Sequence, residues 1–168
     1  KHIGVIVPNL NLDANRIQRL LQRYLPASTW DLSLGLPLID YPLIAHALQF
    51  LKLEKNVLSN YQVQLLLYSP YLKHAQQEFI LRTELLQNSK LLRQDYINYE
   101  NFITELTNVA PTLALLLKNL TPYPEINTTN NWVKIFKTRL NNLGFPGDLA
   151  LNSTLYQCWQ RLNILFDE

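Results

Sequence analysis

The sequence predicts a mainly α-helical protein, in which a multi-helix array follows a small N-terminal βαβ piece. Two observations carry this prediction. Runs rich in β-branched apolar residues precede Gly35, whereas apolar residues after Gly35 recur with the 3.6-residue period of a helix. We therefore divide the chain into an α/β piece, residues 1–36, and a helical domain, residues 37–168.

The βαβ prediction depends on three consecutive segments. Residues 2–9 (HIGVIVPN) form a short apolar run closed by proline and asparagine, as expected of a buried strand in a parallel sheet. Residues 11–26 place apolar side chains at helical spacing, with Asn11 or Asp13 available as the cap. Residues 29–35 (TWDLSLG) suit a second short strand. Strand, helix and strand within about 30 residues match the size of a βαβ unit.

Helical patterns then continue to the end of the chain. Pro42 suits a first helical position, Ser59 and Gln62 form a capping box, and Gly144 suits a helix C-terminus. Residues 121–131 are the candidate linker. The expected helices cover residues 42–53, 60–69, 72–86, 99–106, 111–120, 131–143 and 154–166.

The composition indicates a lightly charged chain. Of its 168 residues, 17% are charged, below the roughly 25% of an average soluble domain, and the formal net charge is +2. The single cysteine, Cys158, excludes an internal disulfide and is expected to be a buried structural thiol. No apolar run approaches the ~18 residues of a membrane span, so we expect a cytoplasmic protein without a membrane partner. Because the chain contains no methionine, we expect it to be part of a larger protein.

Sequence motifs for catalysis are missing. A phosphate-binding loop needs closely spaced glycines and a Lys-Ser/Thr pair, but the four glycines are isolated. Two carboxylate pairs, Asp95 with Glu100 and Glu78 with Glu84, could be considered for acid–base chemistry, but we expect them to be solvated helix charges. We assign no catalytic role to the three histidines, His2, His46 and His74. The sequence therefore predicts no catalytic residue, no cofactor and no metal site in this chain.

Two basic stripes are the candidate binding residues. Arg16, Arg19 and Arg23 share one face of the first expected helix, and Lys134 and Lys137 share a face of a later one. Either stripe could contact DNA phosphates or simply form a solvated helix face. A net charge of +2 gives little electrostatic steering, so any DNA binding is expected to be weak.

Four stretches resemble a known family. IGVIVPNLNLDANRIQRLLQRYLP resembles the strand and helix that restart the second RecA-like domain of UvrD/RecB-type superfamily I helicases. LSLGLPLIDYPLIAHALQFLKL and YQVQLLLYSPYL resemble segments of AddB-like proteins. LNNLGFPGDLALNSTLYQCWQRLNIL is similar to a stretch of bacterial helicase-nuclease-like proteins of DNA repair.

The resemblance implies a fragment of a DNA repair or recombination helicase-nuclease-like protein, beginning with a partial RecA-like piece. Its helical part would contact DNA or pack on the nuclease or helicase domains, or on a partner subunit. The parent would be an ATP-dependent helicase or exonuclease using ATP and Mg²⁺, with those sites outside this chain. VPNLN stands where helicases carry Tyr-Arg-x-Asn, which implies an inactivated, AddB-like helicase fold.

Two alternatives stay open. One is a protein-interaction module without catalytic activity, suggested by the light charge and by nine tyrosines and three tryptophans. The other is an independent helical DNA-binding domain.

Overall fold

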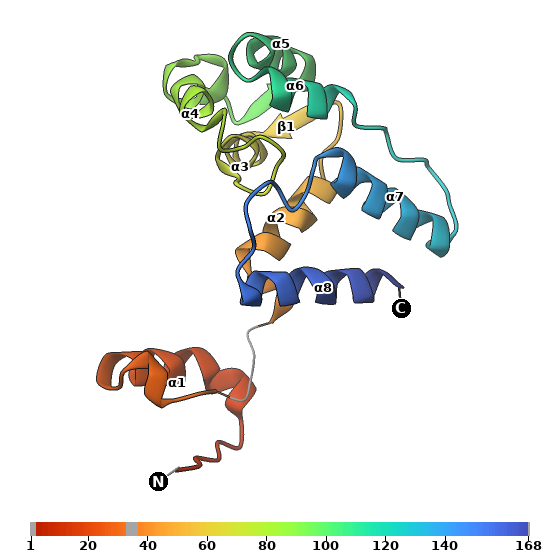
Figure 1. The fold of residues 1–168 in the computed structure, drawn as a ribbon. Coiled ribbons are helices and arrows are strands. Elements are labelled where there is room, and N and C mark those ends of the chain that lie inside the picture. The colour runs from red at the N-terminus through yellow and green to blue at the C-terminus, as the bar shows by residue number, and fades with distance from the viewer. Residues whose placement is uncertain (1–2, 33–36, 168) are drawn as a thin grey trace. The chain divides into compact units, whose positions relative to one another are not determined.

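The computed structural model describes residues 3–32 and 37–167. The chain divides into two compact units, Lys1–Pro37 and Leu38–Glu168, which we describe separately. The division falls one residue after the sequence-based one. Figure 1 shows that helices dominate the described residues. None of these helices is both long enough and apolar enough to cross a membrane.

The N-terminal unit contains one long helix, α1 (Leu10–Tyr24), followed by a 3-10 turn, η1 (Ala27–Thr29). The predicted helix is thus confirmed. It starts earlier than expected, after Asn9 rather than at a cap on Asn11 or Asp13, and Asn9 makes no side-chain capping bond. The helix ends at Tyr24, because the backbone of Leu25, just before Pro26, is extended.

The two strands of the predicted βαβ piece do not form in the described residues. Residues 3–7 belong to no sheet, Thr29 closes η1, residues 30–32 continue as irregular chain, and residues 33–35 lie outside the described residues. A parallel strand needs a neighbour to satisfy its backbone N–H and C=O groups, and no described segment supplies one. The RecA-like part of the fold prediction is therefore not confirmed, whereas its mainly helical part is.

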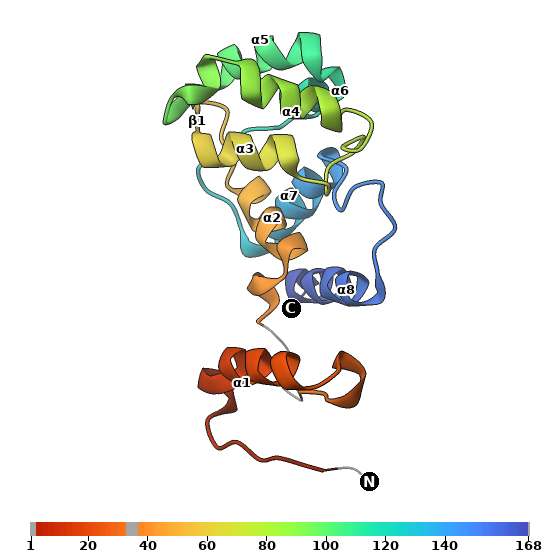
Figure 2. The same ribbon diagram turned by 90° about the vertical axis from the view of Figure 1, so that its left-hand side faces the viewer.

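The second unit is a helical array with one small sheet. Its elements are η2 (Leu38–Asp40), α2 (Pro42–Leu51), β1 (Val57–Ser59), α3 (Asn60–Tyr68), α4 (Phe79–Asn88), η3 (Leu91–Arg93), β2 (Tyr96–Asn98), α5 (Tyr99–Val109), α6 (Pro111–Lys118), α7 (Thr129–Asn142) and α8 (Ser153–Asp167). Pro42 does occupy the first turn of α2, and Ser59 and Gln62 do form the capping box of α3. Figures 1 and 2 show α2 lying beside α7 and α8, while α4, α5 and α6 group together.

One helix begins later than its sequence pattern predicts. The pattern favours a helix from residue 72, but α4 begins at Phe79. The preceding residues form turns because they pack tightly on the loop after α7. His74 has a φ of 56° and donates its backbone N–H to Asp148 Oδ2 at 2.6 Å. Gly144 approaches so closely that a Cβ there would lie 2.4 Å from the Cβ of Lys73. The contacts with this loop therefore outweigh the helix propensity of the residues before Phe79.

The sequence analysis missed the two strands. β1 and β2 pair antiparallel, with Leu58 opposite Ile97 and both side chains fully buried. The first residue of each following helix extends the ladder: Asn60 donates its N–H to Asp95 O, and Tyr99 donates to the carbonyl of residue 56. Three-residue strands carry too little sequence pattern to be recognised, since alternation needs at least four residues.

A buried arginine fastens the end of α2. Arg139 of α7 is 4% exposed and donates to three backbone carbonyls, those of Phe50, Leu53 and Thr121. Its guanidinium also lies 4.2 Å from the centre of the Tyr123 ring. A cation at a helix C-terminus interacts favourably with the helix dipole, although burial lowers the pKa of Arg139. Arg139 thus joins α2, α7 and the segment that links α6 to α7.

A buried ion pair fastens α4 to α6. Glu78 Oε2 accepts from Arg82 NH2 at 2.7 Å, and the same carboxylate accepts the backbone N–H groups of Thr112 and Leu113. Glu78 therefore caps the N-terminus of α6, where a negative charge is favourable. Burial alone would raise the pKa of Glu78, but the bonds from Arg82 and Thr112 outweigh it, so the pKa lies below its usual value.

We predict that Arg139→Met destabilises the helical unit by about 3 kcal/mol. The substitution keeps an apolar stem but leaves three carbonyls without their donor, and each unsatisfied buried group costs about 1–3 kcal/mol. Arg161→Met on the exposed face of α8 is the matched control, with an expected change within about 0.5 kcal/mol. Urea unfolding followed by circular dichroism measures both. Equal stability of the two variants would contradict the role assigned to Arg139.

We predict that Glu78→Gln costs about 3 kcal/mol at pH 7, because it leaves Arg82 buried without its counter-ion. The pKa of Glu78 is lowered in the folded chain, so its stabilisation is present above its unfolded pKa near 4.5 and is lost as pH falls through the folded pKa. The difference between wild type and Glu78→Gln should therefore shrink below pH 4.5. Exposed Glu84→Gln is the control, and a pH-independent gap would refute the assignment.

Candidate nucleic-acid interface

The arginine stripe of α1 lies on the surface, as its spacing predicts. Arg16, Arg19 and Arg23 are all exposed. Arg19 donates from Nε to the carbonyl of Asn15 at 3.0 Å, and the Arg23 guanidinium lies 5.5 Å from the centre of the Tyr24 ring. None of the three forms an ion pair with a carboxylate in the described residues. Their guanidinium groups are therefore available to an external anion.

Only one of the two lysines of the α7 stripe could offer its full charge to an external anion. Lys134 is exposed, but Lys137 forms an ion pair with Asp167 near the end of α8. The pairing joins residues thirty positions apart, so the sequence pattern gave no sign of it. The two stripes belong to different compact units, and we treat them as two separate surfaces.

The net charge of the protein resides in the N-terminal unit. Residues 1–37 contain four basic and two acidic residues, whereas residues 38–168 contain eleven of each. The helical unit therefore has no net charge to attract a polyanion. Any electrostatic attraction to phosphates therefore comes mainly from the basic residues of the N-terminal unit.

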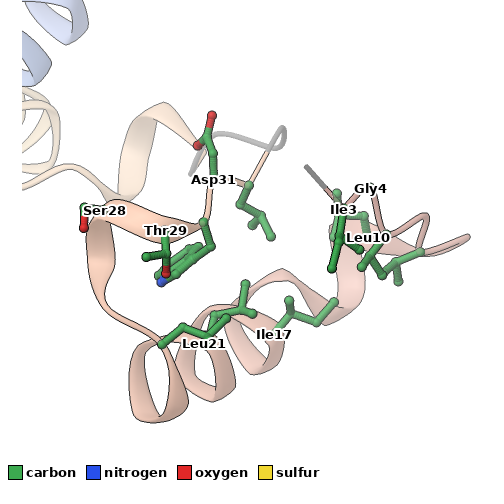
Figure 3. A pocket seen from close by; sticks show the side chains of 13 residues that line it. Ile3, Gly4, Leu10, Ile17, Leu21, Ser28, Thr29 and Asp31 are labelled. Atoms are coloured by element: carbon green, nitrogen blue, oxygen red, sulfur yellow. The ribbon is translucent and has the colours of Figure 1, made fainter. Parts of the chain in front are cut away.

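The opposite face of α1 is apolar and borders an open hollow of about 860 Å³. Leu10, Ile17 and Leu21 lie on this face, and the chain before and after the helix completes the lining (Figure 3). No side chain of residues 3–32 is fully buried, and Leu10, Ile17 and Leu21 are half-buried, so residues 3–32 cover this apolar face only in part. The helical spacing of Ile17 and Leu21 was visible in the sequence, whereas the incomplete cover of this face by residues 3–32 was not.

The described histidines make structural contacts. His46 Nδ1 lies 2.8 Å from the hydroxyl of Ser69, which is 1% exposed and thus closed to a substrate. Burial lowers the pKa of His46. His74 Nδ1 lies 2.7 Å from Gln77 Oε1. His2 lies outside the described residues.

The carboxylate pairs considered for acid–base chemistry do not assemble a site. Glu78 is buried against Arg82, while Glu84, Asp95 and Glu100 are exposed. Among the described residues no three histidine, cysteine or acidic side chains converge as metal ligands do. Cys158 is buried, as expected, and burial raises the pKa of its thiol, which disfavours the reactive thiolate.

Comparison with known proteins adds no relative. No family model matches the chain, and neither the curated proteins nor the solved structures contain a match.

Proposed function

We propose that the chain is a non-catalytic, DNA-contacting part of a helicase-nuclease-like protein of DNA repair or recombination. The observation that carries the proposal is the arginine stripe of α1: three exposed guanidinium groups on one helix face, without carboxylate partners in the described residues. Arginine forms bidentate bonds to phosphate oxygens, and one helix face can follow a backbone without reading base sequence.

The resemblance to AddB-like and UvrD/RecB-type proteins supplies the biological setting of this proposal. In that setting residues 1–36 are part of a RecA-like domain completed by other segments of the parent, and the helical unit packs on the remaining domains or on a partner subunit. ATP and Mg²⁺ would bind elsewhere in the parent. The apolar face of α1, which residues 3–32 cover only in part, supports this arrangement, since other segments of a RecA-like domain would bury such a face.

A protein-interaction module is the second candidate function, and the apolar hollow favours it. The two candidates use opposite faces of α1, so substitutions separate them. A replacement on the arginine face should affect DNA binding alone, whereas a replacement in the hollow, such as Ile17→Asp, should leave DNA binding unchanged.

We predict that replacing Arg16, Arg19 and Arg23 together by Glu abolishes the weak DNA binding of the chain. If each arginine neutralises one phosphate, the slope of log affinity against log salt for duplex DNA is about −2.7, so a fourfold rise in salt weakens wild-type binding about 40-fold. Fluorescence anisotropy with a labelled duplex, repeated across a salt series, measures affinity and slope.

The matched control reverses Lys134 and Lys137. Because Lys137 is already paired with Asp167, we expect this variant to lose less than about threefold in affinity and to keep a slope within one unit of wild type. An unchanged affinity and slope in the arginine variant would show that the stripe is only a solvated face and would reject the proposed function.

A further inference from the structure

The connection between α6 and α7 is the longest stretch of the described helical unit without regular structure or backbone hydrogen bonds. Figure 1 shows it running outside the helices without a helix or strand of its own. Residues 121–127 form no backbone–backbone hydrogen bond with any described residue. Pro122 and Pro124 contribute to this, because proline has no backbone N–H. The backbone of this stretch is therefore free to bind another molecule in extended form.

One side chain anchors the connection, and the chain beyond that anchor lies in solvent. The Tyr123 hydroxyl donates to the carbonyl of Leu51 at 2.5 Å, and the Tyr123 ring lies 4.2 Å from the guanidinium of Arg139. Glu125 is exposed, and Ile126 is 90% exposed. An endopeptidase must draw a peptide bond out of its own structure, and segments of this kind are its preferred targets. The bond between Glu125 and Ile126 can enter an active site without breaking a backbone hydrogen bond.

The chain after this bond is held to the chain before it by contacts that do not depend on the bond. Arg139 donates to the carbonyls of Phe50 and Leu53 at the end of α2. Lys73 donates its backbone N–H to the carbonyl of Leu143. Five buried side chains from α7, α8 and the loop between them belong to the same core as α2: Leu140, Leu143, Phe145, Cys158 and Leu162.

We propose that the bond between Glu125 and Ile126 is a site at which an endopeptidase cuts the helical unit, and that residues 1–125 and 126–168 stay assembled after the cut. Hydrolysis breaks the C–N bond, and water supplies a hydroxyl group to the Glu125 carbonyl and a proton to the Ile126 nitrogen. The new carboxylate and ammonium groups form at exposed positions, so neither charge has to be buried. The cut removes chain connectivity and leaves the core contacts in place.

The other glutamates of the chain lie in better protected backbone. Residues 1–37 contain no glutamate. Glu54 lies in the short connection between α2 and β1, where the carbonyls of Leu53 and Asn56 accept hydrogen bonds. The remaining internal glutamates either lie within helices or precede α4 in a buried ion pair: Glu84, Glu100, Glu105 and Glu78. A glutamate-specific endopeptidase therefore compares the proposed site with five others in one chain.

The first experiment is limited digestion of the full 168-residue chain by a glutamate-specific endopeptidase, followed by intact-mass spectrometry. The first cut should follow Glu125 and be at least about tenfold faster than any other, since a cut inside a helix requires local unfolding. Glu125→Gln should remove this cut, whereas the matched control Glu54→Gln should keep it. A first cut after another glutamate, or equal rates after Glu54 and Glu125, overturns the proposal.

The second experiment asks whether the two pieces stay together. After digestion to a single cut, light scattering during size exclusion at micromolar concentration should give one species with the mass of the whole chain, while a denaturing gel shows two pieces. The thermal midpoint of the cut protein should rise with its concentration, because unfolding now separates two molecules. Glu125→Gln, treated with the same protease, is the control whose midpoint does not change with concentration. Pieces that separate during size exclusion overturn the second half of the proposal.

Discussion

The guanidinium of Arg139 is the interaction on which the helical unit most depends. It reaches from α7 to the carbonyls of Phe50 and Leu53 at the end of α2, and to Thr121 in the segment that leads into α7. The last carbonyls of a helix have no partner inside that helix, and burying them without a donor is costly. Helix α2 packs against both α7 and α8. Fixing the end of α2 therefore also fixes where α7 and α8 join the core.

The arrangement of α3, α4, α5 and α6 depends on polar groups as well. Glu78 satisfies the free N–H groups at the start of α6 and neutralises Arg82, and the short ladder between β1 and β2 sets where α3 and α5 begin. Arg82 is fully buried and keeps one guanidinium nitrogen without a partner in the described residues. Hydrophobic burial supplies most of the stability of such a core, whereas these few directional bonds select one arrangement of its helices.

The two units differ in charge and in how far their apolar side chains are buried. The helical unit has a closed apolar core, no net charge and paired or exposed carboxylates, and its described residues form no catalytic cluster. The N-terminal unit has three arginines on one face of α1 and, on the other, an apolar surface that residues 3–32 cover only in part. The described surface of this unit thus combines cations of the kind that bind phosphate with apolar area. The assignment to a helicase-nuclease-like protein of DNA repair stays a proposal that depends on the sequence resemblance.

The sequence by itself determined the helices, because period and capping are local. The first-turn position of Pro42, the capping box of Ser59 and the exposed arginines of α1 all follow from spacing along one helix. Tertiary structure decided what depends on distant partners: the delayed start of α4, the pairing of Lys137 with Asp167, and the short ladder. It also decided that no described segment pairs with residues 3–7, since an apolar run specifies burial but not the neighbour that provides it.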